Sequence, residues 1–347
     1  MRLATVGLHG PLEMEERVVA AETDPESGLP CLIDVTSAGE LWWQSRGCGD
    51  PGAWARATLP GELGRLLRGG ELALEMARDA VAAALTHSPQ ATAPSGAPLR
   101  WPEELIERLP LLRAPMLRDF YCFERHVAAG AARRHEPIPA AWYRRPVYYK
   151  GNPATLLAPG AVVPWPAYSD RLDYELEFAC VTFPAGQDLD LTAAGRAIAG
   201  YTVFADFSAR DIQAEEMQAR LGPAKSKDFA SGLGPWLVTA DEVADPSELT
   251  AAAYVNGQEV ARGSMSEARW SFAEMVSYAS GAEPLAAAEI IASGTVGGGS
   301  GQEAGRFLEP GDRVDLELVG YGTLSHTIGP RHQGGGRVVM KVQPDPI

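Results

Sequence analysis

A series of strand patterns after Pro102 constrains the fold of this chain more than any other feature of its sequence. The patterns are PVYYKG, ELEFACVTF, AIAGYTVFAD, AAYVNGQEV, DRVDLELVGYG and GRVVMKV. They are rich in β-branched and aromatic residues, and Gly, Pro, Asn and Asp turns separate them. We find no internal repeat and no alternation of long helices with strands, which a doubly wound fold would require. The sequence therefore predicts an α+β fold that is predominantly β.

The first hundred residues differ in pattern from the rest of the chain. Short strand and turn patterns cover residues 1 to about 45, and apolar residues recur at helical spacing from Pro60 to His87, which predicts a helix. Pro, Ala and Ser are concentrated from Ser88 to Pro102, as is typical of a boundary loop. We therefore predict a small N-terminal domain over residues 1–100 and a second domain over residues 101–347.

Local signals predict three further elements in the second domain. Asn256-Gly257 lies between β-rich residues, a strong signal for a hairpin. A helix is expected from Ala209 to about Arg220, with Ser208 as its N-cap and a Gly-Pro pair as its stop. Another helix is expected over about Ser271 to Ala279.

Composition excludes several classes of partner. The chain has 45 acidic and 30 basic residues, and this net charge of −15 disfavours nucleic acid and anionic membranes while it suits a cation. The four cysteines show no CxxC spacing, so we expect reduced packing residues of a cytoplasmic protein. The start of the chain lacks the apolar core of a signal peptide, and there is no run of 18 apolar residues. We expect neither secretion nor membrane insertion.

The segment LDYELEFACV, residues 172–181, places acidic residues on one side of a strand. Strand side chains alternate between faces, so Asp173, Glu175 and Glu177 point the same way. This face becomes apolar after Glu177, which indicates that Glu177 points toward an interior. Asp173 stands at the strand end, and we expect it on the surface.

Three other stretches combine charged residues with apolar surroundings. They contribute Asp119 and His126 in LRDFYCFERH, Asp206, Arg210 and Gln213 in GYTVFADFSARDIQ, and Lys227 in KSKDFASGLGPW. Carboxylates that converge without a counter-charge repel one another and take up protons, unless a divalent cation binds between them. Oxygen ligands without Cys or His at metal spacing select a hard cation, so Mg²⁺, Mn²⁺ or Ca²⁺ is the expected cofactor.

Together these motifs resemble the fumarylacetoacetate hydrolase superfamily. The resemblance rests on RDFYCFERH, LDYELEF, FADFSARDIQ, KSKDF followed by GPW, and SGTVGGGSGQE with FLEPGD, in this order from Arg118 to Leu324. It implies a mixed β-roll catalytic domain behind a small N-terminal domain, as in bacterial-type members, and a homodimer. It also implies a small oxo-acid substrate and a role in aromatic catabolism.

The resemblance also implies residue roles. Metal ligands would be Asp119, Glu175, Glu177 and Asp206. His126 would be the general base, Glu303 would orient it, and Arg210 and Lys227 would bind substrate or stabilise developing negative charge. Substrate contacts would come from Tyr121, Tyr149, Gln213 and Thr295.

Three functions remain open on this reading. The first is metal-dependent hydrolysis of a carbon–carbon bond in a 1,3-dicarbonyl acid such as an acylpyruvate, in which His126 activates water and the metal stabilises the enolate leaving group. The second is decarboxylation, isomerisation or dehydration of a 2-oxo acid on the same scaffold. The third is non-catalytic ligand binding. Tyr149-Lys150-Gly151-Asn152 stands where fumarylacetoacetase has Tyr-His-Gly-Arg, which leaves the physiological substrate open.

Overall fold

A large mixed sheet forms the body of the protein. The computed structural model describes residues 1–9, 14–25, 27–102 and 105–331, and within them this sheet has 12 strands. Its main path runs β4 (Arg100–Trp101), β3 (Pro30–Asp34), β2 (Met14–Thr23), β1 (Arg2–His9), β14 (Ser231–Thr239), β12 (Ile198–Asp206), β11 (Glu175–Thr182), β17 (Ile290–Ser300), β6 (Leu117–Phe120) and β7 (Tyr148–Gly151). Beside this path, β5 (Ile106–Arg108) pairs with β1 and β8 (Leu156–Leu157) pairs with β14.

Two smaller sheets complete the β structure of the described residues. One has five strands in the order β16 (Gln258–Ser264), β15 (Thr250–Val255), β18 (Arg313–Leu318), β19 (Gly322–Ile328) and β9 (Val162–Val163). The other pairs β10 (Leu172–Asp173) with β13 (Ser208–Ala209). The hairpin predicted at Asn256-Gly257 is confirmed, because this pair joins the antiparallel strands β15 and β16.

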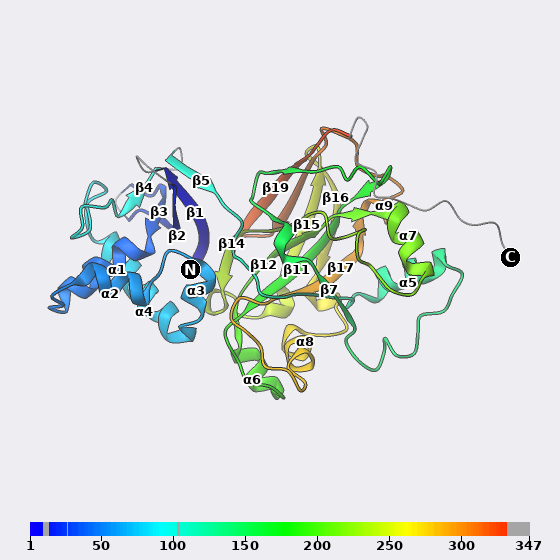
Figure 1. The fold of residues 1–347 in the computed structure, drawn as a ribbon, viewed down its shortest axis with the longest axis horizontal. Coiled ribbons are helices and arrows are strands. Elements are labelled where there is room, and N and C mark those ends of the chain that lie inside the picture. The colour runs from blue at the N-terminus through cyan, green and yellow to red at the C-terminus, as the bar shows by residue number, and fades with distance from the viewer. Residues whose placement is uncertain (10–13, 26, 103–104, 332–347) are drawn as a thin grey trace.

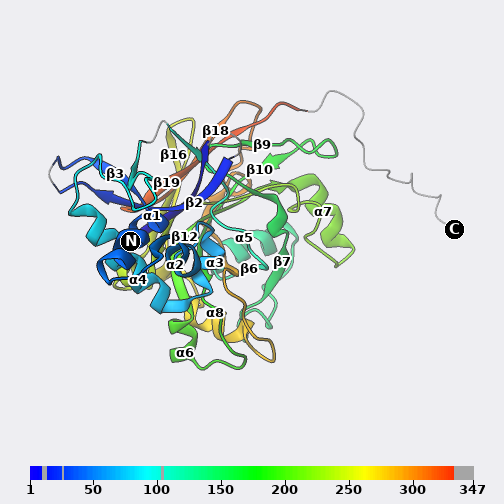
Figure 2. The same ribbon diagram turned by 60° about the vertical axis from the view of Figure 1, so that its left-hand side comes forward.

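The helices fall into two groups (Figures 1 and 2). Four of them lie beside β1 to β4: α1 (Val35–Ser45), α2 (Pro51–Thr58), α3 (Leu63–Leu67) and α4 (Gly70–Leu85). The others lie around the strands after residue 105: α5 (Glu124–Arg133), α6 (Leu191–Arg196), α7 (Arg210–Gln218), α8 (Phe272–Ala279) and α9 (Gly301–Ala304). None of the helices in the described part of the chain is long and apolar enough to cross a bilayer.

The sequence predicted the α+β class correctly, but several local expectations need correction. The helix expected from Pro60 to His87 is two helices, α3 and α4, since Gly70 at the start of α4 adopts a left-handed φ of +65°. Ser208 is not an N-cap: it lies in β13, and its hydroxyl donates to the Asp206 carbonyl. The first 45 residues include α1 as well as strands. The GRVVMKV strand lies outside the described residues.

The N-terminal strands continue the sheet that the later strands form. Arg2 and Leu3 of β1 pair with Val238 and Leu237 of β14, so the sheet runs through the boundary predicted at residue 100. One apolar core spans both parts, and it contains leucines from β1 and α4 together with Leu237 and Ile290. The division into residues 1–100 and 101–347 therefore remains a prediction.

The central strands of the large sheet are buried along their whole length. Every residue of β11 and β12 is buried, and nearly every residue of β17. Strands covered on both faces bury charged side chains only where those charges are matched or bind a metal. The acidic residues at the ends of these strands therefore mark a functional site.

Candidate active site and metal centre

Carboxylates from three strands of the large sheet converge. Asp119 comes from β6, Glu177 from β11 and Asp206 from the last position of β12. One oxygen from each lies within 4.8 Å of the others, and all three side chains are buried. The sequence predicted this group of residues, although they lie up to 87 positions apart (206 − 119).

The three buried carboxylates of this acidic triad need protons or cations to balance their charges, and Lys227 forms an ion pair with one of them, Asp206. Burial and then the Asp206 charge raise the pKa of Asp119 well above its ordinary range, and burial and the Asp119 charge do the same to the pKa of Glu177. Among the residues described, nothing hydrogen-bonds to Oδ1 of Asp119 or Oδ1 of Asp206. Buried polar atoms without partners are costly, and oxygen ligands are what a hard divalent cation prefers. The triad therefore fits a divalent cation.

Glu175, two residues before Glu177, has different surroundings. Its Oε1 accepts a hydrogen bond from Nη2 of Arg210 at 2.7 Å, and its Oε2 accepts one from Nζ of Lys227, which also donates to Asp206. Although burial raises the pKa of Glu175, the Arg210 and Lys227 charges hold it well below its ordinary range. Glu175 is therefore ionised and neutralised by the protein itself.

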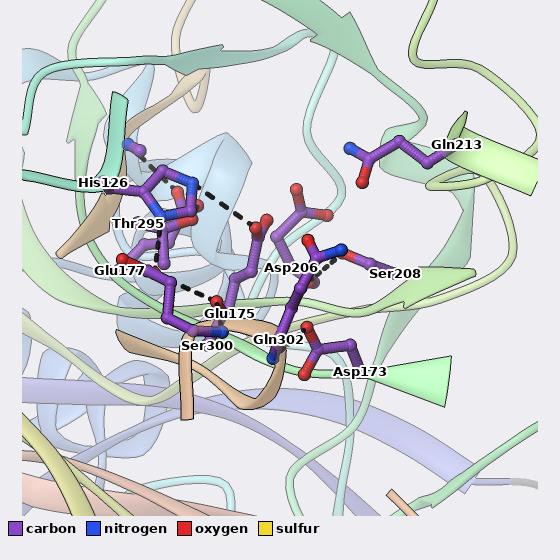
Figure 3. Close-up of polar contacts among 12 residues, drawn as sticks. His126, Asp173, Glu175, Glu177, Asp206, Ser208, Gln213, Thr295, Ser300 and Gln302 are labelled. Atoms are coloured by element: carbon purple, nitrogen blue, oxygen red, sulfur yellow. Dashed lines mark hydrogen bonds and ion pairs between the residues drawn. The ribbon is translucent and has the colours of Figure 1, made fainter. Parts of the chain in front are cut away.

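His126 lies in the first turn of α5, close to this glutamate. Its Nε2 is 3.7 Å from Oε1 of Glu175, and its Nδ1 is 2.7 Å from Oε2 of Glu303 in α9 (Figure 3). Glu303 also accepts hydrogen bonds from the Gly298 N–H and the Ser300 hydroxyl, each at 3.0 Å. Burial raises the pKa of Glu303, but the bond and charge of His126 together with the hydrogen bonds from Gly298 and Ser300 lower the pKa overall. A carboxylate on Nδ1 sets the tautomer that leaves Nε2 free to accept a proton.

The four expected substrate contacts surround these groups. Tyr149 donates to Oδ2 of Asp206 at 2.8 Å, and Thr295 donates to Oε1 of Glu177 at 3.1 Å. The ring of Tyr121 meets His126 edge-on with centroids 5.5 Å apart, and Gln213 accepts from Nη1 of Arg210 at 2.8 Å. Every predicted site residue except Glu303 lines one pocket of about 850 Å³. The structure therefore brings the predicted set together.

Sequence reasoning missed Asp173 and Gln302. Asp173 is fully buried and forms an ion pair with Nε of Arg210 at 2.7 Å, so the expectation that it lies on the surface was wrong. Gln302 lines the pocket, and its backbone N–H donates to Asp173. The alternation that placed Asp173 on the same face as Glu175 was a signal that both carboxylates share one environment.

Comparisons with known proteins agree with this geometry. Residues 116–329 match the profile of the family described as fumarylacetoacetate (FAA) hydrolase C-terminal. The chain is 28% identical over 272 residues to "Oxaloacetate tautomerase FAHD2A, mitochondrial" of Homo sapiens, a match that covers 78% of this chain and 81% of that protein. It is 34% identical over 186 residues to "Oxaloacetate tautomerase YisK" of Bacillus subtilis (strain 168), which covers 53% of this chain and 61% of that protein.

Solved structures share the fold over nearly the whole chain. Maleylpyruvate hydrolase from Sphingobium sp. SYK-6, in complex with manganese(II) ion and pyruvate, superposes with a TM-score of 0.65 at 20% identity and covers 96% of this chain and 100% of that one. The 5-carboxymethyl-2-hydroxymuconate delta-isomerase from Mycobacterium smegmatis has a TM-score of 0.64 at 20% identity, with the same coverage. With a family profile matched over more than half of its length and a triad suited to a divalent cation, the chain belongs to the fumarylacetoacetate hydrolase superfamily of enzymes.

Proposed function

We propose that this protein is a divalent-metal-dependent enzyme that interconverts the keto and enol forms of a small dicarboxylic 2-oxo acid such as oxaloacetate. The observation that carries the proposal is the position of His126, a base held by Glu303 in the same pocket as the acidic triad and two buried cations. Keto–enol exchange needs these parts, because a base must move a carbon-bound proton while positive charge stabilises the oxygen. The names of the relatives FAHD2A and YisK support this reaction.

The acidic residues have two roles in this proposal. Asp119, Glu177 and Asp206 hold the metal, whereas Glu175, which the sequence also predicted as a ligand, lies outside this group and anchors Lys227 and Arg210. When bound, a divalent cation polarises a carbonyl group and stabilises the negative charge that develops on its oxygen.

The remaining residues move the proton and hold the substrate. Nε2 of His126 takes the proton from the carbon next to the substrate carbonyl and returns it to the oxygen, so no atom is gained or lost. Glu303 keeps Nδ1 of His126 protonated throughout. Lys227 and Arg210 face the substrate carboxylate, which their buried positive charges attract. Further substrate contacts come from Tyr121, Tyr149, Gln213 and Thr295.

Carbon–carbon bond hydrolysis of an acylpyruvate is the second candidate. The pocket of about 850 Å³ favours it, because this volume accommodates ligands much larger than a four-carbon acid. His126 would then deprotonate a water molecule instead of a carbon atom. Decarboxylation and dehydration use the same enolate stabilisation and are outcomes of the same assay.

A substrate panel with metal exchange tests the proposal. Oxaloacetate and several acylpyruvates are incubated with the metal-free, Mg²⁺-loaded and Mn²⁺-loaded protein, and products are identified by NMR. We expect metal-dependent enol–keto exchange with an intact carbon skeleton, whereas hydrolysis would yield two acids. His126→Ala should remove turnover and retain Mn²⁺ binding. Turnover without metal would contradict both candidates, and Mn²⁺ binding without any turnover would favour the non-catalytic alternative.

The assembly is also a proposal. We infer a homodimer from the resemblance to the superfamily, and light scattering on the purified full chain measures it. A monomeric mass at assay concentrations would contradict the inference.

A further inference from the structure

Asp173 is a buried carboxylate that the proposed chemistry does not use. Its Oδ2 accepts hydrogen bonds from Nε of Arg210 at 2.7 Å and from the Gln302 N–H at 3.0 Å, and its Oδ1 accepts one from the Tyr174 N–H at 2.9 Å. A Cβ atom on Gly301 would lie 2.5 Å from Oδ1, so the chain packs against this carboxylate without spare room. Asp173 thus joins the start of α7 to the start of α9, which begins 128 residues later (301 − 173).

Each of the two joined segments positions one side of the active site. Arg210 also donates from Nη2 to Glu175 and from Nη1 to Gln213, and the contact with Asp173 fixes the direction of this guanidinium, whose side chain is only 4% exposed. The short helix α9 carries Glu303, which holds His126. In Figure 3, Asp173 and Gln302 lie together on the side of Glu175 away from His126.

We propose that Asp173 is a positioning residue that holds Arg210 and α9 in a single frame, that is, in fixed relative positions. The Arg210 guanidinium, which contacts Glu175, and the Glu303 carboxylate, which contacts His126, then keep a constant distance from each other. This inference rests on the proposed function and extends it to a residue outside the reacting groups. Because all three polar neighbours of Asp173 are donors, only a group with two acceptor oxygens satisfies them. An asparagine would direct its NH₂ group at one of these donors.

The variant Asp173→Asn tests the frame, because it changes the charge and one acceptor but hardly the volume. Asp34→Asn is the matched control. Asp34 is equally buried, lies 3.5 Å from Nε of Arg17, and accepts hydrogen bonds from the Thr36 and Ser37 N–H groups at the start of α1, away from the pocket. Both variants should lower the melting temperature, but only Asp173→Asn should disturb the site.

Three measurements distinguish a positioning role of Asp173 from a role in folding stability alone. They are kcat/KM with oxaloacetate, the affinity of the Mn²⁺-loaded protein for oxalate by calorimetry, and amide hydrogen exchange over residues 300–306. For Asp173→Asn we expect a loss of about 10²-fold in kcat/KM, the size of effect that a misplacement of about 1 Å produces, together with weaker oxalate binding and faster exchange. Asp34→Asn should keep all three at wild-type values.

A double variant tests whether the effect of Asp173→Asn depends on Arg210. On Arg210→Gln, the further change Asp173→Asn should cost less in kcat/KM than it does in the wild-type protein, because the bond to Arg210 is already lost and the bond to Gln302 remains. Wild-type kcat/KM in Asp173→Asn, or the full loss on the Arg210→Gln background, would overturn the proposal. If the wild-type protein neither turns over oxaloacetate nor binds oxalate, the proposed function fails. In that case amide hydrogen exchange alone tests the positioning role of Asp173, and unchanged exchange over residues 300–306 in Asp173→Asn would contradict it.

Discussion

Glu175 and Glu177 are neighbours on one face of β11, yet they have opposite electrostatic surroundings. Both are buried, with at most 4% of either residue exposed. Glu175 contacts Arg210 and Lys227, which hold its pKa low despite burial. Glu177 meets the Asp119 carboxyl instead, and burial together with this neighbour raises its pKa.

The difference shows how one strand face supplies two kinds of site. At Glu175 the protein itself provides the positive charge, and the carboxylate holds the Arg210 and Lys227 side chains in orientations that suit substrate binding. Within the described part of the chain, Glu177 accepts hydrogen bonds from the Gly294 N–H and the Thr295 hydroxyl, each at 3.1 Å, and neither group carries a full charge. The missing charge is what a divalent cation supplies. Five experiments test this contrast, from the largest expected effect to the smallest.

Replacing Glu177 by glutamine should have the largest effect on activity. The change removes a ligand from the acidic triad, and metal assistance contributes several kcal/mol, so we expect turnover to fall by about 10⁴-fold. Mn²⁺ titration by calorimetry should show no tight binding. The metal-free variant should be at least as stable as wild type, because the substitution removes the repulsion between Glu177 and the carboxylates of Asp119 and Asp206. A large fall in its melting temperature would contradict this account.

Replacing Glu175 by glutamine should instead act on stability. It leaves the Arg210 and Lys227 charges buried with one partner fewer, and breaking a buried ion pair costs about 3–5 kcal/mol. Urea unfolding of the metal-free protein measures the loss, and Glu177→Gln is the control. A stable Glu175→Gln protein that has lost Mn²⁺ binding would show that the two glutamates have the same role.

Acid should weaken metal binding. The pKa values of Asp119 and Glu177 lie well above their ordinary ranges, so protons compete with the cation as the pH falls. Each displaced proton changes the affinity by about tenfold per pH unit, or ~1.4 kcal/mol. Calorimetric Mn²⁺ titrations from pH 8 to pH 6, in buffers of different ionisation enthalpy, should reveal proton release. Affinity that does not change over this range would argue against protonated carboxyls in the metal-free site.

Without metal, the same carboxyls should make stability depend on pH. Because their pKa is raised in the folded state, the native protein binds more protons than the unfolded chain above the ordinary carboxyl values of 3.8 and 4.5. Their contribution to stability therefore falls as the pH rises from that point. Urea unfolding in chelator across pH 5 to 8 should show a shallower fall for Glu177→Gln than for wild type.

Removing the Tyr149 hydroxyl should have the smallest effect. Tyr149→Phe deletes one hydrogen bond of 2.8 Å to Asp206, which also contacts Lys227. The loss of one such bond should cost about 1 kcal/mol of binding or folding free energy. We expect Mn²⁺ affinity to change by less than about tenfold, with the fold intact. A loss as large as that of Glu177→Gln would mean that Tyr149 belongs to the metal site itself.

Most of the site could be predicted from short-range patterns. The alternation in LDYELEFACV indicates that Glu177 faces an interior, and the apolar strand before Asp206 places this aspartate at a strand end. The burial and pairing of the Asp173 side chain could not be predicted in this way. Its burial depends on Arg210 and on the Gln302 N–H, which lie 37 and 129 residues away, and nothing in the local pattern shows that they approach.

The sequence by itself determined the class of fold, the family and most of the residues that meet in the pocket, because these follow from side-chain period, turn residues and motif order. The tertiary structure alone decided which carboxylates receive the protein's cations and which remain for a metal. The physical reason is that charge pairing depends on distances of a few ångströms between segments far apart in the chain. Glu175 and Glu177 have the same chemistry and face the same way, and only the packing of α7 and the Lys227 segment against one of them makes them different.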